Sequence, residues 1–283
     1  MTLSIRDLDV SFGPRPVVDI DALDCAAGQI VGLVGESGSG KSMTATAVLG
    51  LAPRLGATVR GSITLDGLEL VGAPERRLAE VRGRRIAMIF QSPSGAFNPV
   101  LRVGEVFVRT MRLHGERSRA AARKAATAAL EEVLLPAACF DRYPHQLSGG
   151  QLQRVAIALA LALRAEILLA DEPTSALDVT VQAEILRLLL GLKERGLGVL
   201  LITHDLGVVA EVCDNVAVMR ASRIVESGPT ATVLARPSDE YTKSLLDAVP
   251  RLGSSSVAAS PPGATAARAG TVSSPEGENA RSL

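Results

Sequence analysis

Hydrophobic positions in the first part of the chain fall into short runs that predict strands. Residues 3–10 and 63–70 have the pattern of short strands, and Asp66-Gly67 between alternating apolar residues is a hairpin signal. The apolar run Ile30–Val34 ends in a glycine-rich loop, which is typical of a buried strand that leads into a helix. We therefore expect a hairpin and a buried strand in this part of the chain.

Residues 102–163 carry a different pattern. The stretch ERSRAAARKAATAALEEVLL is rich in Ala and has charges at helical spacing, and Ser118 is a candidate N-cap. We interpret the Ala-rich face at 120–129 as core and not as a partner surface. The whole block predicts an all-helical insert.

Strands and helices alternate again after this insert. Strands are expected at Ile167–Ala170, Val199–Thr203, Val216–Met219 and Ile224–Glu226, with a helix at Val179–Glu194. Strands that alternate with helices indicate an α/β protein with a parallel sheet and right-handed crossovers.

The composition limits what the core and the end of the chain can be. The 283 residues are 47% hydrophobic but only 2% aromatic, without Trp, so the core must consist of Ala, Leu, Val and Ile. From about Arg251 the chain is rich in Ser, Ala, Pro and Gly without periodicity. Such a segment buries too little apolar surface to offset its ordering entropy, so residues 251–283 are expected to be a disordered tail.

Charge, cysteines and hydropathy exclude several classes of protein. Lys+Arg and Asp+Glu number 30 each, and this zero net charge gives no basic excess for nucleic acid. Cys25, Cys139 and Cys213 lack metal-binding spacing and are interpreted as buried reduced thiols. The N-terminus is charged where a signal peptide would be apolar, and the longest apolar run, Val155–Leu163, is far below the roughly 20 residues of a membrane span. The chain is expected to act inside the cell without crossing a membrane.

Residues 35–42, GESGSGKS, match the pattern G-x-x-x-x-G-K-[ST] between a predicted strand and a predicted helix. Glycines in such a loop allow N–H groups to turn inward, and the helix N-terminus adds partial positive charge, so the loop suits phosphate. Lys41 would reach the β- and γ-phosphates, and Ser42 would offer a hydroxyl to Mg²⁺. The alternative, a Gly/Ser-rich surface turn, does not explain the Lys-Ser pair or the strand before it.

A second apolar run, in ILLADEP at 167–173, delivers Asp171 and Glu172 to the carboxyl end of a strand, where α/β proteins place their sites. Asp171 suits a contact to Mg²⁺ through water. Glu172 suits a general base for an attacking water. The alternative is an acidic pair that stabilises a helix N-terminus, which leaves the strand and the phosphate loop unexplained.

Together these segments resemble the ATP-binding subunit of an ABC transporter, over roughly residues 3–250. The motifs that carry the resemblance occur in the family's order: Phe12, GESGSGKS at 35–42, Gln91 in MIFQSPSGAFNP, LSGGQ at 147–151, ILLADE, SALD at 175–178 and His204 in LLITHD. The resemblance implies a P-loop NTPase of the ABC type with a mixed sheet core and an inserted all-helical subdomain. It places the core, with an N-terminal β-subdomain, at 1–91 and 164–250 and the helical subdomain at 92–163.

The resemblance also implies the roles of individual residues in two ATPase domains packed head to tail. ATP would be bound by Phe12, which stacks on adenine, and by Gly35, Glu36, Ser37, Gly38, Ser39, Gly40, Lys41, Ser42 and Met43. Catalysis would use Lys41, Gln91, Glu172 and His204; Mg²⁺ would be bound by Ser42, Gln91 and, through water, Asp171. Ser148, Gly149, Gly150 and Gln151 would meet the ATP of the partner, and Asp178 would lie at the dimer interface. The Ser hydroxyl and the close backbone approach that glycines allow at a helix N-terminus suit a γ-phosphate.

Longer segments resemble the peptide/nickel importer branch, among them IALALALRAEILLADEPTSALDVTVQAEIL and YTKSLLDAVPRL. AVPRL leans toward oligopeptide and dipeptide members, whereas AFNP leans toward nickel members. The resemblance implies a second homologous ATPase subunit, two membrane permease subunits and an external substrate-binding protein as partners. A soluble ABC ATPase without a transport role is the alternative class.

Three features depart from the expected pattern. Phe12 replaces the more usual Tyr, so weaker stacking on adenine is expected, although Phe keeps the face of the ring. Some peptide-type members continue into a cysteine-containing extension linked to an iron–sulfur cluster, but residues 251–283 contain no Cys, so no cluster is predicted. The segment VMRAS at 218–222 lacks the glycine expected in a hairpin, which should affect a turn and not catalysis.

Overall fold

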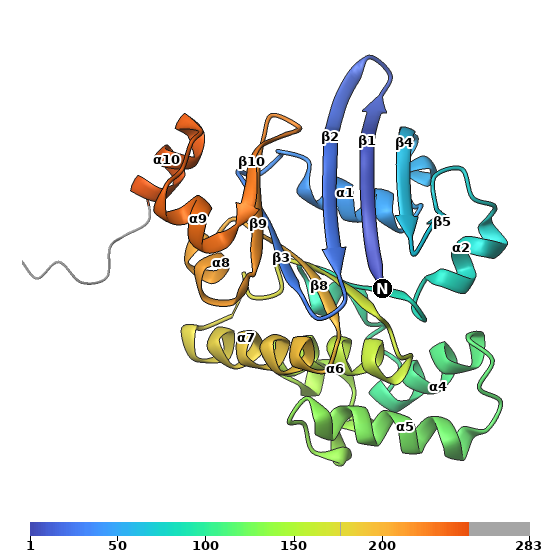
Figure 1. Ribbon diagram of the computed structural model, residues 1–283. Helices are drawn as coiled ribbons and strands as arrows, with labels where there is room; N and C mark the ends of the chain where they lie inside the picture. Colours follow the sequence, from blue (N-terminus) through green and yellow to red (C-terminus); the bar gives the residue numbers. More distant parts are fainter. Residues whose placement is uncertain (176, 249–283) are drawn as a thin grey trace, which may run out of the picture. The chain divides into compact units, whose positions relative to one another are not determined.

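The computed structural model describes residues 1–175 and 177–248, in which one ten-stranded sheet runs in the order β5-β4-β1-β2-β10-β9-β3-β8-β7-β6 (Figure 1). The strands are β1 (Thr2–Phe12), β2 (Arg15–Ala26), β3 (Ile30–Val34), β4 (Thr58–Leu65), β5 (Leu68–Glu69), β6 (Ile86–Ile89), β7 (Ile167–Asp171), β8 (Gly198–Thr203), β9 (Asn215–Arg220) and β10 (Arg223–Pro229). The helices are α1 (Lys41–Val48), α2 (Glu75–Val81), α3 (Pro93–Ala96), α4 (Val103–Leu113), α5 (Arg119–Glu132), α6 (Gly149–Ala162), α7 (Val179–Glu194), α8 (Leu206–Val212), α9 (Thr230–Ala235) and α10 (Glu240–Asp247). Short 3₁₀ turns lie at Ala52–Leu55, Ala137–Asp141 and Pro144–Gln146.

The sheet is mixed, and each half follows from the sequence pattern of its strands. β3, β6, β7, β8 and β9 pair in parallel, and every residue of β3, β7 and β8 is buried, as expected for strands covered on both faces. β1 pairs antiparallel with β2 and β4, and β9 pairs antiparallel with β10. The parallel sheet predicted from the strand–helix alternation is therefore correct for one half only, whereas the mixed sheet implied by the resemblance is confirmed.

The predicted hairpin lies between β4 and β5. Leu65 pairs with Leu68, and Asp66 and Gly67 have φ of 48° and 78°, the left-handed conformation that a two-residue hairpin turn requires. The chain adopts the same conformation at Ala221 and Ser222, between β9 and β10, without any glycine. A turn without glycine thus forms at the end of VMRAS, and its expected lack of effect on catalysis stays a prediction.

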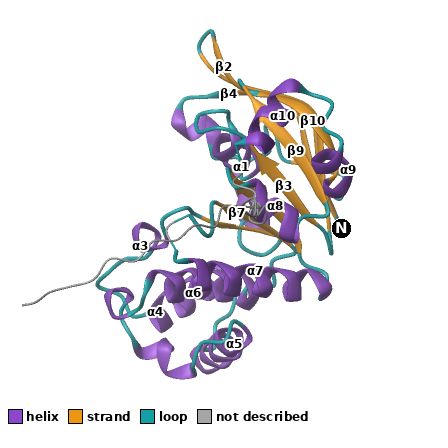
Figure 2. Cartoon of the chain, turned by 90° about the vertical axis from the view of Figure 1, so that its left-hand side faces the viewer, coloured by secondary structure: helices purple, strands orange, loops and turns teal. Residues whose placement is uncertain are grey.

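The helices predicted for residues 102–163 are confirmed as α4, α5 and α6, which Figure 2 shows together with α7 beside the strands. The Oγ atom of Ser118 accepts a hydrogen bond from the amide of Ala121 at 3.1 Å and caps α5. Ala122, Ala126 and Ala129 of α5 are buried, so the Ala-rich face is core as predicted.

The three cysteines are free thiols, but only Cys25 and Cys139 are buried, whereas Cys213 is partly exposed. The interpretation of all three as buried thiols is therefore wrong for Cys213, which lies in the short loop between α8 and β9. Within the described ranges no helix is both long enough and apolar enough to span a bilayer. The predicted tail at 251–283 and most of the segment AVPRL lie outside the described residues.

Candidate functional site

The phosphate loop joins β3 to α1 and is held in shape by its own lysine. Lys41 Nζ donates hydrogen bonds to the carbonyl oxygens of Gly35, at 2.7 Å, and Glu36, at 2.8 Å. Gly40 caps α1 at φ of 112°, and a Cβ atom there would overlap the carbonyl oxygen of Val17. The loop thus curls around the ammonium group, with the glycine needed for conformation and space.

Burial lowers the pKa of Lys41, while the carboxylates of Glu172 and Asp171 oppose that shift. Lys41 is only 5% exposed and its ammonium group is paired with backbone carbonyls, so the positive charge lies at the centre of the loop. An anion bound by the loop would therefore meet a desolvated positive charge, whose attraction is stronger than in water.

Ser42 and Asp171 meet at the first turn of α1 and the end of β7. Ser42 Oγ donates a hydrogen bond to Asp171 Oδ1 at 3.0 Å. Burial raises the pKa of Asp171, and the hydrogen bond from Ser42 and the charge of Lys41 act in the opposite direction. The two neighbouring oxygen atoms are hard ligands of the kind that Mg²⁺ prefers.

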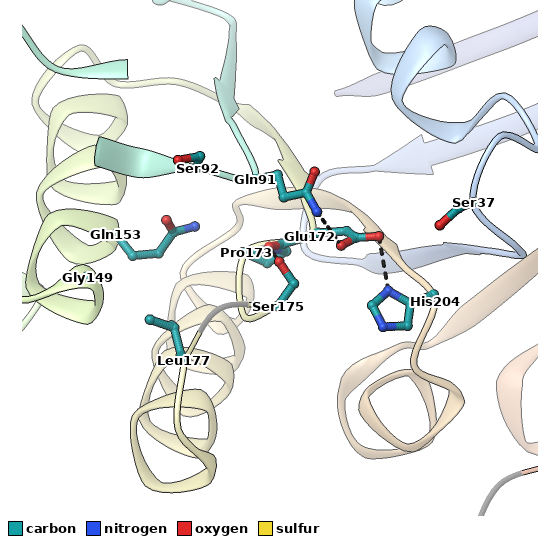
Figure 3. Close-up of a pocket in the computed structure, with 10 residues that line it drawn as sticks. All are labelled: Ser37, Gln91, Ser92, Gly149, Gln153, Glu172, Pro173, Ser175, Leu177 and His204. Carbon is teal, nitrogen blue, oxygen red and sulfur yellow. Dashed lines mark hydrogen bonds and ion pairs between the residues drawn. The ribbon is translucent and has the colours of Figure 1, made fainter. Parts of the chain in front are cut away.

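Glu172 lies between two other predicted site residues. Its carboxylate accepts a hydrogen bond from Gln91 Nε2 at 2.9 Å and lies 3.0 Å from His204 Nδ1 (Figure 3). Glu172 itself has φ of 46°, an uncommon value for a residue with a side chain. The three residues follow β6, β7 and β8, which are neighbours in the sheet, so their meeting point is the carboxyl edge of parallel strands.

A cavity of about 610 Å³ opens beside this cluster. Its lining combines the phosphate loop, the segments after β6, β7 and β8, and helix α6: Ser37, Gln91, Ser92, Gly149, Gln153, Glu172, Pro173, Ser175, Leu177 and His204 (Figure 3). The carboxylate, the imidazole and the amide can position and deprotonate a water molecule next to a phosphate group.

The signature residues 148–151 form the start of α6. Ser148 Oγ accepts from the amide of Gln151 at 3.3 Å, and Gln151 Oε1 accepts from the amide of Ser148 at 3.0 Å. This reciprocal capping box fixes the helix N-terminus. Ser148 and Gly149 are exposed, whereas Gly150 is buried and a Cβ atom there would overlap Val181 Cγ1 of α7.

The remaining predicted residues lie apart from the Glu172 cluster. Phe12 is half-buried at the tip of β1, where it pairs with Arg15. Met43 is half-buried in α1 and packs against the core of the N-terminal strands. Asp178 caps α7 by accepting a hydrogen bond from the amide of Val181 at 3.0 Å. Gly38 is exposed in the phosphate loop, with φ of 83°.

Three residues at the site were not expected from the sequence. Tyr241 Oη accepts a hydrogen bond from the amide of Glu36 at 3.0 Å, and the amide of Ser222 donates to the carbonyl oxygen of Ser39 at 3.1 Å. Gln153 lines the cavity with a 1% exposed side chain whose Nε2 atom has no hydrogen-bond partner among the described residues. The only sequence signal for Gln153 is its place two residues after the signature, and the sequence gives no signal for the contacts of Tyr241 and Ser222 with the loop.

Comparison with known proteins gives one consistent result. The family profile described as "ABC transporter" matches residues 18–175. A probable peptide ABC transporter ATP-binding protein of Sinorhizobium fredii is 46% identical over 88% of this chain and 77% of its own length. An oligopeptide transport ATP-binding protein of Salmonella typhimurium is also 46% identical, over 89% of this chain and 77% of its own. A dimeric ATP-binding cassette solved in a post-hydrolysis state with ADP and phosphate superposes with a TM-score of 0.68 at 28% identity, covering 81% of this chain and 98% of the cassette.

Proposed function

The chain belongs to the ABC transporter family as an ATP-binding ATPase, and from this premise we propose that it powers the import of di- and oligopeptides. The ATPase assignment is supported above all by the position of the Glu172 carboxylate, which lies between Gln91 and His204 beside a complete phosphate loop. The peptide substrate is supported by the names of relatives that are 46% identical to this chain.

In the proposed reaction, the loop amides of residues 35–43 and the ammonium of Lys41 bind the phosphates of ATP. Ser42 Oγ, the Gln91 side chain and, through water, Asp171 would hold Mg²⁺, and the oxygens of Ser42 and Asp171 fit because they already lie 3.0 Å apart. A cation bound there would neutralise charge on the phosphate oxygens. Phe12 would offer the face of its ring to the adenine.

Glu172 orients the attacking water and accepts its proton, because it supplies the carboxylate in the lining of the cavity beside the phosphate loop. His204 contacts the γ-phosphate and keeps Glu172 in place through its Nδ1 atom. Gln91 holds the second carboxylate oxygen. Most of the catalysis is positioning and electrostatic stabilisation, as phosphoryl transfer requires.

The active unit is a pair of ATPase subunits, in which Ser148, Gly149, Gly150 and Gln151 of one chain meet the ATP bound by the other. The exposure of Ser148 and Gly149 supports this role for the start of α6. Asp178, at the start of α7, would lie at the interface. We propose a homologous second ATPase as the partner, since the branch uses two different subunits.

Closure and reopening of this pair would drive two permease subunits through Gln91 and the helical subdomain at 92–163. The chain would then lie on the cytoplasmic face of the membrane, and an external binding protein would deliver the substrate. Substrate recognition takes place in the permease and the binding protein. The segment AFNP favours nickel as the second candidate cargo.

The test is uptake by cells that lack this protein, measured with labelled dipeptides and oligopeptides in parallel with radioactive nickel. We expect loss of peptide uptake alone, restored by the wild-type chain but not by Glu172→Gln. Loss of nickel uptake alone would transfer the chain to nickel import. If neither uptake changed, peptides and nickel would both be rejected as the transported substrate.

A further inference from the structure

A tyrosine near the end of the described chain contacts the phosphate loop directly. Tyr241, in α10, is 4% exposed, and its hydroxyl oxygen accepts a hydrogen bond from the backbone amide of Glu36 at 3.0 Å. The two residues are 205 positions apart in the sequence. The bond is part-buried, and the hydroxyl gives the loop amide an acceptor that links the phosphate loop to α10.

The aromatic ring is fixed from two sides. It packs in a hydrophobic cluster with Val34, the last residue of β3, and with Leu206 and Val209 of α8. On β9, the guanidinium carbon of Arg220 lies 4.8 Å from the centre of the ring, within the range of a cation–π interaction. The hydroxyl therefore has a defined position relative to the strand that delivers the loop.

Helix α10 is itself anchored to the sheet. Glu226 of β10 accepts hydrogen bonds from the amides of Ser238, at 2.7 Å, and Asp239, at 3.2 Å. Asp239 then caps α10 by accepting a hydrogen bond from the amide of Tyr241 at 2.8 Å. The position of the tyrosine thus depends on a carboxylate in the strand next to the one that bears Arg220.

Glu36 connects this anchor to the lysine of the loop. The amide of Glu36 donates to Tyr241 Oη, and its carbonyl oxygen accepts from Lys41 Nζ at 2.8 Å. A shift of Glu36 would therefore move one of the two backbone carbonyls that hold the ammonium group. Anchoring Glu36 keeps the loop in the shape in which Lys41 lies at its centre.

We propose that Tyr241 is a positioning residue for the phosphate loop, and that α10 is therefore part of the nucleotide site, although it lies beyond the residues 18–175 matched by the family profile. This inference rests on the proposed binding of ATP by that loop. Without the hydroxyl, a smaller fraction of molecules would have the loop in its binding-competent shape. The apparent affinity for ATP would fall in proportion to that fraction.

The test compares Tyr241→Phe, which keeps the ring and removes only the hydroxyl, with the wild-type chain in ATP binding and steady-state hydrolysis. Tyr143→Phe is the matched control, since Tyr143 is the other tyrosine of the chain and stacks on His145 at 5.5 Å in the helical region. We expect Tyr241→Phe to weaken ATP binding about 5-fold, the value of one net hydrogen bond, and Tyr143→Phe to leave it unchanged.

Two further measurements distinguish a positioning role of Tyr241 from a purely structural role. The KM for ATP should rise about 5-fold in Tyr241→Phe with kcat nearly unchanged, because the chemical groups stay in place. Hydrogen exchange in the peptide that contains Glu36 should accelerate without nucleotide. Unchanged ATP affinity in Tyr241→Phe, alongside normal binding by the wild-type chain, would overturn the inference.

Two other outcomes are also informative. Failure of the wild-type chain itself to bind ATP would reject the proposed function and not the contact of Tyr241. If Tyr241→Phe is insoluble, Glu226→Gln provides the second variant, because it weakens the anchoring of α10 while leaving the tyrosine intact. ATP binding by Glu226→Gln should weaken in the same direction, and unchanged affinity there would overturn the inference.

Discussion

The carboxylate of Glu172 and the imidazole of His204 lie 3.0 Å apart, although they follow different strands, β7 and β8. The two strands pair in parallel, with Asp171 opposite Ile202, so the residues that follow each strand leave the sheet at the same edge. The pairing of the strands therefore places this carboxylate and this imidazole together.

The first prediction concerns Glu172→Gln, which keeps the size of the side chain and one acceptor oxygen but removes its basicity. ATP binding should remain near the wild-type level, while turnover falls about 10²–10⁴-fold, the usual contribution of a general base. Nucleotide titration and phosphate release measure the two quantities. Normal turnover in this variant would reject the assignment of Glu172 as base.

Lys41→Ala should instead impair binding. The variant removes the charge at the centre of the loop and leaves the carbonyl oxygens of Gly35 and Glu36 without their partner. Loss of a charged hydrogen bond of about 1.5–3 kcal/mol corresponds to roughly 10–150-fold weaker ATP binding. Equilibrium titration with labelled ATP is the measurement, and an unchanged dissociation constant would contradict this role of the loop.

Gly150→Ala tests whether the second signature glycine has a structural function within its own chain. The added methyl group would overlap Val181 Cγ1, and a β-branched residue in a helix has little rotamer freedom to move away. Overpacking of this kind should lower the free energy of unfolding by about 1–3 kcal/mol, as measured by denaturant titration.

The matched variants are Gly149→Ala and the double variant Gly150→Ala with Val181→Ala. A methyl group on Gly149 would meet Leu177 only at 3.6 Å, an ordinary contact, so this variant should keep the wild-type free energy of unfolding. The double variant should lose at least ~0.5 kcal/mol less than the sum of the single ones. Strict additivity would show that the contact between α6 and α7 is not the cause.

Glu226 predicts a dependence of stability on pH. Burial opposes its ionisation, but hydrogen bonds from Ser238 and Asp239 outweigh burial and lower the pKa from 4.5 to about 2. Because the folded pKa lies below the unfolded one, the stabilisation is fully present above pH 4.5 and is lost as the pH falls toward 2. Glu226→Gln should show a smaller loss of unfolding free energy between these pH values, and an identical pH profile would contradict the prediction.

The sequence allowed the buried strands and the order of the motifs to be predicted, because both depend on neighbouring residues. The runs that form β3, β7 and β8 are short and apolar, except for Asp171 and Thr203 at the ends of β7 and β8. β2 was missed because its buried positions change parity: Val18 and Ile20 are buried, then Asp21 and Ala22 are both exposed before Leu23. Such a shift breaks the period of two on which strand prediction rests.

The contacts that complete the site could not be predicted, because they join distant parts of the chain. The bond between Tyr241 and Glu36 depends on how α10 packs beside β9, and the overlap of Gly150 with Val181 depends on the crossing of α6 and α7. The pattern around Tyr241, Gly150 and Val181 is that of an ordinary helix. The sequence thus predicts which groups are present, and the packing of the helices decides which of them meet.

The place of the last two strands in the sheet has a consequence for how the protein is made. β9 and β10 lie between β2 and β3, so the two halves of the sheet are joined by residues 215–229. While a ribosome is still making that segment, β2 and β3 each present an unpaired edge, and exposed edges invite pairing with other chains. The emerging chain therefore presents both edges until residues 215–229 have been made.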